Sequence, residues 1–493
     1  MTLLGGCSDI QNPLNPQDSS KEEEDDTETS ENSQKEFEWT RIITDSSQLT
    51  SWHVLNTGGD YFLYGNNVSA DSSKTYYLFS SANAWQNSTP GHSFSDLIMG
   101  NVLYAYTTNS YQAGTTVSYS TNKGVTYTAL MEDVGVQTIL QGTGSIDYLL
   151  VNELAGYENK IYKLTYNSVQ NTVSSSSITP SGEVKMDKMV AGAFLLQGAI
   201  AAEDIVIAPD YSGSLWIVTQ EGAWVRQIST GISGAEAKML FTDQFGKTLF
   251  FLNGASLHSV LFEELLNSQE DTALYDFSSY QQHLDSGTFG SGNYSTAAVY
   301  DDANRSVIIC YYPQYKGFCS MTTTDGKNYT IPQGAGAEDT ILGTRKLNGK
   351  YYVYGDDVYE SADGLTWSSL EHPYTSSYIT SKISVLGYQN NSLYSYSGNL
   401  RAYSPAQTDE WPLVSGGFNG ENASHGAIND ADGKIFIYTD YWGSPGGVFT
   451  LNEEGIVVNT LETGVVGMQS SYMTLFAQYH SGQEYGFYLL EQK

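Results

Sequence analysis

The sequence predicts an all-β protein: a single large β-propeller of about ten four-stranded blades, with eight or nine blades as alternatives. One observation is a unit of four short strands that recurs about every 45 residues, the period of a propeller blade. The other is the composition, because 493 residues include 48 Gly and 38 Tyr but only 16% charged residues. That balance suits short strands and tight turns. Two smaller propellers are a second possibility, although no linker-like composition divides the repeats.

Each unit starts with an apolar strand and a turn, followed by a strand rich in aromatic residues. Asn-Gly and Asp-Gly turns between apolar runs are strong hairpin signals. The first turns lie at Gly58, Gly100, Gly144, Asp204, Gly246, Asn304, Asn348, Asn390, Asp432 and Ser470. The sequence therefore predicts about ten consecutive hairpin-rich units.

The two ends of the repeat region are expected to complete each other. The last unit supplies three strands, at 465–468, 472–479 and 485–490, whereas residues 37–43 form an orphan strand before the first unit. Pairing this N-terminal strand with the C-terminal blade would close the ring and leave no open sheet edge.

The N-terminal segment predicts a lipid anchor. Residues 3–7, Leu-Leu-Gly-Gly-Cys, resemble the lipobox of bacterial lipoproteins, in which Cys7 would carry the lipid. Only six residues precede Cys7, so either the true start lies upstream or the match is accidental. Residues 8–38 are polar and include an acidic run at 21–26, as in a disordered tether. We expect residues 1–6 to be a signal-peptide remnant, residues 7–36 a lipidated acidic tether and residues 37–493 the propeller.

Charge limits the partners and the location. Asp and Glu outnumber Lys and Arg by 55 to 22, a formal net charge of −33. Such a field repels nucleic acid and anionic lipid, so neither is an expected partner. No apolar run approaches the ~20 residues that span a bilayer. Ser8 after the cysteine resembles lipoproteins sent to the outer membrane, and the acidic run resembles a surface-export signal. We therefore expect attachment to the outer membrane or cell surface through the lipid alone.

One turn carries a family resemblance. Residues 361–367, Ser-Ala-Asp-Gly-Leu-Thr-Trp, resemble the Asp box of the BNR, or sialidase-like, propellers, with Ser361, Asp363, Gly364, Thr366 and Trp367 as the structural residues. Weaker copies lie at 120–127 and 323–329, and degenerate copies end at Trp85, Trp224 and Trp411. The whole layout is similar to that of uncharacterised outer-membrane lipoproteins of Gram-negative bacteria. Asp boxes are structural, so this resemblance implies a fold and not an activity.

The residues that a sialidase would need are not recognisable. The resemblance to sialidases implies three arginines for the substrate carboxylate and an early Arg-Ile-Pro motif. The chain has five arginines, and Arg41-Ile42-Ile43 lacks the proline; the other four are Arg226, Arg305, Arg345 and Arg401. Another glycoside hydrolase would need two carboxylates across a pocket, which a single sequence cannot identify. The catalytic residues, if any, stay unknown, and a non-enzymatic protein is the favoured interpretation.

Metal and cofactor sites have no support in the sequence. The seven histidines show no HxH or HxxxH spacing. Residues 429–433 begin like a calcium loop, but an ordinary hairpin turn explains them better because the following ligands are missing. We expect no metal and no cofactor. Cys310 and Cys319 flank a predicted hairpin loop, which allows either a disulfide in an exported protein or two buried thiols.

Aromatic residues recur in the loops between the second and third strands of the units. Amphipathic rings on rigid loops suit stacking on sugars or docking of a protein. The candidate ligand-binding residues are Tyr111, Tyr157, Tyr211, Tyr315, Tyr441, Trp442, Asp210 and Asp440. The leading hypothesis is a non-enzymatic surface lipoprotein that binds an extracellular glycan or protein. The alternatives are a glycosidase with a carboxylate pair on the same face and a scaffold within an outer-membrane complex.

Overall fold

The structure is a computed structural model that describes strands between Trp39 and Glu491 and part of the segments that join them. Besides the strands given below, the described residues are 100–102, 116, 121–122, 124–127, 132–134, 144–145, 168–171, 242–247, 263, 303–304, 317, 324–331, 339–340, 348–349, 356–357, 362–367, 370–373, 383, 390–391, 404, 411–414, 452 and 455–456. Residues 1–38, with the predicted signal remnant, Cys7 and the tether, lie outside them.

The described strands form ten separate antiparallel sheets. The first five are β2 (Leu49–Asn56), β3 (Tyr61–Asn67), β4 (Lys74–Ser80), β5 (Ala84–Ser88); β6 (Asp96–Met99), β7 (Leu103–Tyr106), β8 (Val117–Ser120), β9 (Thr128–Met131); β10 (Gly135–Gln141), β11 (Ile146–Glu153), β12 (Glu158–Asn167), β13 (Thr172–Ile178); β14 (Ile200–Ala202), β15 (Ile205–Pro209), β16 (Leu215–Thr219), β17 (Gly222–Arg226); and β18 (Met239–Phe241), β19 (Thr248–Asn253), β20 (Ser256–Leu261).

The other five are β21 (Thr296–Asp302), β22 (Arg305–Tyr311), β23 (Phe318–Thr323); β24 (Ile341–Leu347), β25 (Lys350–Gly355), β26 (Val358–Ser361), β27 (Ser368–Ser369); β28 (Val385–Gln389), β29 (Ser392–Tyr396), β30 (Leu400–Tyr403); β31 (His425–Asn429), β32 (Ile435–Thr439), β33 (Gly447–Leu451), β34 (Val457–Glu462); and β1 (Trp39–Ile43) with β35 (Val465–Ser471), β36 (Thr474–Ser481) and β37 (Glu484–Glu491).

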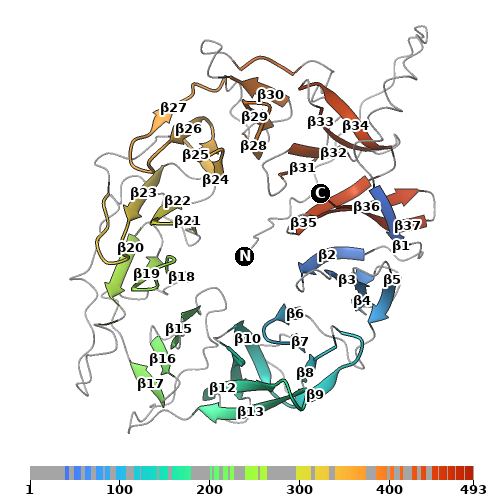
Figure 1. The fold of residues 1–493 in the computed structure, drawn as a ribbon, viewed down its shortest axis with the longest axis vertical. Coiled ribbons are helices and arrows are strands. Elements are labelled where there is room, and N and C mark those ends of the chain that lie inside the picture. Colours follow the sequence, from blue (N-terminus) through green and yellow to red (C-terminus); the bar gives the residue numbers. More distant parts are fainter. Residues whose placement is uncertain are drawn as a thin grey trace.

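The sheets follow one another in chain order around a central axis, which gives a β-propeller-like, all-β fold (Figure 1). The core lies between neighbouring sheets. For example, Val307, Ile309 and Phe318 of one sheet pack with Tyr351 and Val353 of the next, and all five are almost completely buried. Burial of this kind is the main driving force that holds the sheets face to face.

The N-terminal strand β1 does not stand alone. It pairs antiparallel with β37, and Trp39 lies opposite Leu490, so the last sheet has the order β1-β37-β36-β35. The same sheet therefore contains residues from both ends of the repeat region. Its β37 has a paired strand on each side, and β1 takes the outer position.

Three sheets have three described strands where the sequence predicts four. In two of them a single bridged pair of described residues lies where the outer strand is expected, because Thr322 bridges to Thr330 and Arg401 bridges to Leu413. Pro412 lies beside the second bridge. Proline has no backbone N–H to donate, so a longer ladder is interrupted at this position.

The turn at 361–367 is held by its own side chains. The Ser361 hydroxyl accepts a hydrogen bond from the Gly364 amide at 2.9 Å. The Asp363 carboxylate accepts hydrogen bonds from the amides of Leu365 at 2.8 Å and Thr366 at 2.7 Å. Gly364 has a φ of 76°, a left-handed conformation in which side chains are strained. The short polar side chains and the glycine therefore determine this turn together.

Two other turns repeat this arrangement. In the turn after β8 the Ser120 hydroxyl accepts from the Gly124 amide at 2.7 Å, and Asn122 takes the position of the aspartate. In the turn after β23 the Asp325 carboxylate accepts from the Lys327 and Asn328 amides, at 2.8 Å each. All three turns follow the third strand of their sheet, so they lie at equivalent places in the repeat.

Candidate functional site

The connections between sheets lie beside the turns that join second and third strands. The Gly317 amide, just before β23, donates to the Asp339 carbonyl at the entry to β24. The Asp356 amide, between β25 and β26, donates to the Thr340 carbonyl at 3.0 Å. These contacts place both kinds of segment at the same end of the sheets. The turn at 361–367 follows β26 and lies at the opposite end of its strand.

The candidate ligand-binding residues of the loops fall outside the described part of the chain. They are Tyr111, Tyr157, Tyr211, Tyr315, Tyr441, Trp442, Asp210 and Asp440. Tyr315 belongs to the loop after β22, which ends at Tyr311. The loop ligand set therefore stays a prediction.

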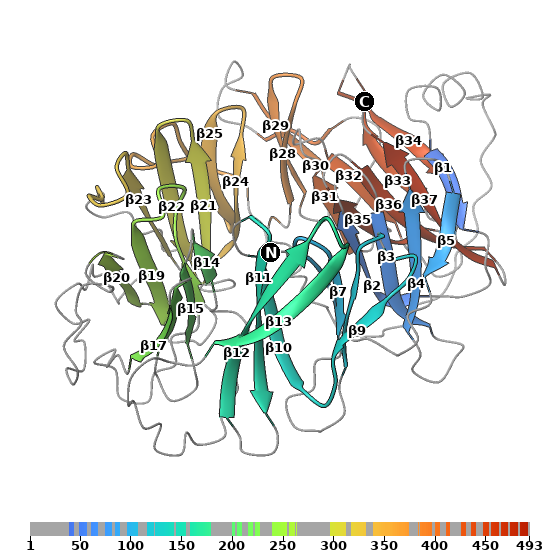
Figure 2. The same cartoon turned by 60° about the horizontal axis from the view of Figure 1, so that its bottom comes forward.

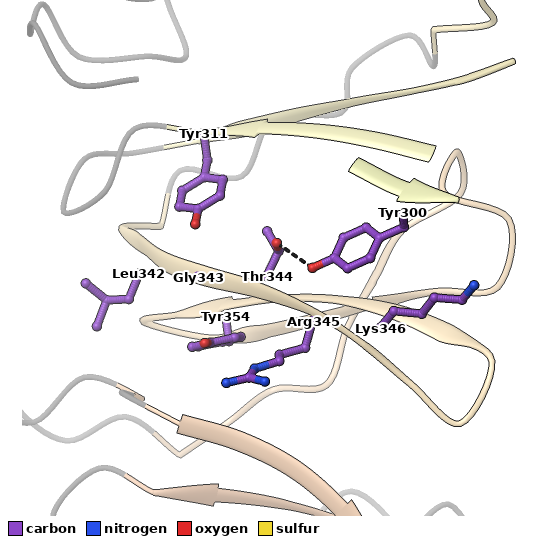
Figure 3. A pocket seen from close by; sticks show the side chains of 8 residues that line it. All are labelled: Tyr300, Tyr311, Leu342, Gly343, Thr344, Arg345, Lys346 and Tyr354. Carbon is purple, nitrogen blue, oxygen red and sulfur yellow. Dashed lines mark hydrogen bonds between the residues drawn. The ribbon is translucent and has the colours of Figure 1, made fainter. Parts of the chain in front are cut away.

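A pocket of about 390 Å³ lies between two neighbouring sheets, along β24 (Figure 3). The inner strands β21 and β24 of these sheets lie side by side (Figure 2). The lining residues come from β21, β22, β24 and β25, and they are Tyr300, Tyr311, Leu342, Gly343, Thr344, Arg345, Lys346 and Tyr354. Its volume is within the range of about 300–1,000 Å³ that is usual for small-ligand pockets. Three phenols and two cationic side chains make it a polar pocket.

Tyr300 is fixed across the gap between the sheets. Its hydroxyl lies 2.7 Å from the Thr344 hydroxyl. Burial raises the pKa of Tyr300 to about 12 and raises the pKa of Tyr311 further. Both phenols therefore stay neutral at physiological pH and can donate or accept hydrogen bonds.

Gly343 makes room for Tyr354. A Cβ atom at position 343 would lie 2.5 Å from the Tyr354 hydroxyl oxygen, which is closer than real Cβ contacts. Gly343 lies opposite Tyr354 in the β24–β25 pairing. β24 is the first strand of its sheet, and its other edge pairs with no described strand. Figure 3 shows Tyr300 and Tyr311 on one side of β24 and Tyr354 on the other. The pocket thus lies along β24, where the absence of a side chain at Gly343 leaves space for the Tyr354 hydroxyl.

The two cationic side chains of the pocket differ in their partners. The Lys346 ammonium forms an ion pair with Asp302, which also accepts a hydrogen bond of 2.8 Å from the Tyr351 hydroxyl. The hydrogen bond from Lys346 lowers the pKa of Asp302. Arg345 has no ion pair with a described acid. Its guanidinium is therefore the positive group of the pocket that no described carboxylate neutralises.

The lining residues define what the pocket can do chemically. Phenol hydroxyls, a guanidinium and a threonine hydroxyl bind polar ligands by hydrogen bonds, and the rings offer faces for stacking. No Asp or Glu is among the described residues that line it. A general acid and base of the glycosidase type would need carboxylates there. The described lining therefore offers hydrogen-bond donors and acceptors but no carboxylate pair.

Cys310 and Cys319 lie directly opposite each other on β22 and β23. Both are buried and both are free thiols. Burial raises the pKa of the Cys319 thiol to about 12 and that of Cys310 well above its usual value. The register is compatible with the disulfide alternative and with the thiol alternative, so the disulfide stays a prediction.

Two features are absent from the described part of the chain. It contains no group of three or more His, Cys, Asp and Glu residues that could hold a metal ion. Its elements include no helix long and apolar enough to cross a membrane.

Comparisons with known proteins give no family. No protein-family model matches the chain, and no curated protein matches it. Among solved structures it is similar to a puromycin hydrolase, with 11% identity, a TM-score of 0.31, and coverage of 91% of this chain and 52% of the hydrolase. The chain thus spans about half the length of that hydrolase.

For two further structural neighbours, the match covers a larger share of the neighbour's own chain. A eukaryotic initiation factor has 7% identity, a TM-score of 0.42, and coverage of 88% of this chain and 94% of the factor. The dihydro-heme d1 dehydrogenase NirN has 9% identity, a TM-score of 0.34, and coverage of 86% and 75%. All three neighbours have β-propeller-type folds. Likeness at this level carries no argument about activity.

Proposed function

We propose that the chain is a non-enzymatic, lipid-anchored β-propeller of about ten blades that binds an extracellular glycan at the cell surface. In this proposal β1 closes the ring by completing the last blade, and the turns at 120–127, 323–329 and 361–367 are Asp boxes. The β1–β37 pairing and the three equivalent turns support the fold part of the proposal. The lipobox-like residues 3–7 and the acidic tether support the location.

The observation that carries the binding proposal is the pocket at β24. Three tyrosines, Tyr300, Tyr311 and Tyr354, supply rings and hydroxyl groups around one polar pocket. Sugars present apolar ring faces and many hydroxyl groups, so such a lining matches them in both respects. The rigid strands that carry these side chains reduce the entropy lost on binding.

One lining residue of the pocket directly precedes a predicted aromatic loop in the chain. Tyr311 is the last residue of β22, and the following loop contains Tyr315. A glycan seated against Tyr311 could therefore extend over the aromatic loops. A protein partner on the same loops remains the second candidate, favoured by the recurrence of aromatic residues at these positions.

A glycosidase is the alternative from a different class. It would require an Asp or Glu pair, about 5 Å apart for retention or about 6.5–9.5 Å apart for inversion. The described lining of the pocket lacks such a pair. Catalysis would thus have to use acids of the loops, such as Asp210 or Asp440.

One experiment separates these functions. The full chain is immobilised and exposed to a panel of neutral and acidic oligosaccharides, and retained glycan and released reducing sugar are measured in the same wells. We expect retention without release. Release of reducing sugar would establish the glycosidase, and absence of both signals would favour a protein partner or a scaffold role.

A further inference from the structure

Arg345 differs from the other described cationic side chains near the pocket. In a chain with 55 acidic residues, Lys346 and Arg305 both pair with Asp302, and Lys350 pairs with Glu360. Arg345 is only partly exposed and lines the pocket, but it has no ion pair with a described acid. A partly desolvated guanidinium is stabilised by a bound anion.

The charge of Arg345 acts on the rest of the pocket. Burial raises the pKa of Tyr300 and of Tyr311, and the charge of Arg345 opposes part of this rise. The electrostatic effect of Arg345 therefore reaches the phenols on the other side of β24. Figure 3 shows Arg345 and Tyr354 on the same side of that strand. An anion at Arg345 can therefore belong to a ligand that also meets the tyrosines.

We infer that the pocket at β24 binds a sugar unit that carries a carboxylate, and that Arg345 recognises the carboxylate. This inference rests on the glycan-binding function proposed above. The planar guanidinium presents paired N–H donors that match the two oxygens of a carboxylate. The phenols of Tyr300 and Tyr311, on the other side of β24 (Figure 3), then contact the hydroxyl groups of the same sugar.

The volume of the pocket and the net charge of the chain limit which acidic glycans fit. The cavity of about 390 Å³ is at the small end of ligand pockets, so it holds one or two sugar units. A net charge of −33 repels a polyanionic chain at long range. A single acidic unit within a mostly neutral glycan therefore fits better than a polyuronate.

The test uses three small probes on the full chain: glucuronic acid, glucuronamide and glucose 6-sulfate. The first two have the same shape and differ in charge, and the third carries a tetrahedral anion. A charged hydrogen-bonded contact predicts that the wild type binds the acid about tenfold more tightly than the amide. Arg345→Gln should remove this preference, so that the acid and the amide bind the variant with equal affinity. Lys350→Gln, on the same hairpin but outside the pocket lining, is the charge-matched control and should keep the preference.

The outcomes separate the inference from the proposed function. Equal binding of acid and amide by the wild type would overturn the inference and leave glycan binding intact. Sulfate binding as tight as that of the acid would overturn carboxylate selectivity. Absence of binding by all three probes, together with a negative glycan panel, would overturn both. Arg345→Lys is a second, conservative variant, which keeps the positive charge but lacks the paired N–H donors of the guanidinium. We expect it to show an intermediate preference for the acid over the amide.

Discussion

The indole Nε1 of Trp367 donates a hydrogen bond of 2.9 Å to the hydroxyl of Ser320, a buried residue on the preceding sheet. The same indole meets the Phe318 ring edge-on, with 5.0 Å between centroids. Trp411 repeats the relationship one sheet later, because its Nε1 donates to the Leu370 carbonyl at 3.0 Å. In each of these two sheets, a tryptophan after the third strand thus donates a hydrogen bond to the preceding sheet.

Replacing Trp367 should separate its hydrogen bond from its packing. Trp367→Phe keeps a ring against Phe318 but leaves the buried Ser320 hydroxyl without this donor, which we expect to lower the free energy of unfolding by about 1 kcal/mol. Trp367→Ala also removes the ring contact and should cost about 3 kcal/mol. Urea unfolding measures both, and equal losses for the two variants would contradict the packing role.

Two glycines with similar backbone angles form a matched pair. Gly364 has a φ of 76°, and a Cβ atom there would lie 2.6 Å from Val307 of the preceding sheet. Gly349 has a φ of 73°, but a Cβ atom there would meet nothing within 4 Å. Gly349→Ala should therefore cost only the backbone strain of about 1–2 kcal/mol. Gly364→Ala should cost about 1–3 kcal/mol more, because the neighbouring sheet must move. Thermal unfolding of the two variants checks this difference.

His372 should make stability depend on pH. Its Nε2 lies 2.9 Å from the Ser395 hydroxyl, and its ring packs edge-on against Trp411. Burial, followed by the positive charge of Arg401, lowers the pKa of His372 to about 4, whereas Asp357 opposes the shift. The unfolded chain has the ordinary pKa of about 6.5, so it binds the proton first as the pH falls. The stabilisation is therefore complete above pH ~6.5 and is lost as the pH falls towards 4.

The variant His372→Gln isolates this effect from the many acids of the chain. Between pH ~6.5 and ~4 the wild type should lose about 2 kcal/mol more unfolding free energy than the variant. Urea unfolding at several pH values gives this difference. Parallel curves for the two proteins would show that His372 does not titrate on unfolding.

The cysteine pair should form a disulfide when the protein is exported. Cys310 and Cys319 lie opposite each other in the β22–β23 register, and oxidising compartments allow the bond. Protein from the periplasm or surface should not react with an alkylating reagent after unfolding unless it is first reduced. Reduction should lower stability by about 2 kcal/mol. Alkylation of both cysteines without reduction would support the alternative of two buried thiols.

Much of the repeat could be predicted from local chemistry. Turn residues such as Gly144, Asn348 and Gly349 have positive φ values, so their identity marks the hairpins in the sequence. The predicted strand at 37–43 pairs with β37 as Trp39–Ile43. Beside Pro412, where the sequence predicts a fourth strand, the described residues form a single bridge, because proline has no backbone N–H to extend the ladder.

The pocket was not predicted, because it depends on two sheets coming together. Tyr300 and Thr344 are 44 residues apart, and only the packing of β21 against β24 joins them. Gly343 is the one local signal. A glycine inside the strand Ile341–Leu347 indicates close approach of another group, which is the Tyr354 hydroxyl. The loop candidates, in contrast, were chosen for exposure and fall outside the described residues.

The most direct test uses a glycan that the wild type retains. It measures how tightly the variants Gly343→Ala and Gly349→Ala bind this glycan. A Cβ atom at 343 would lie 2.5 Å from the Tyr354 hydroxyl oxygen, so the buried Tyr354 side chain must shift, and thermal unfolding of the variant checks that it still folds. A Cβ atom at 349 meets open space on the same hairpin. We predict that Gly343→Ala weakens binding about tenfold, because it displaces the Tyr354 phenol from its place in the pocket lining. Gly349→Ala should bind like the wild type. Unchanged affinity in Gly343→Ala would contradict the central claim that the pocket at β24 is the glycan site.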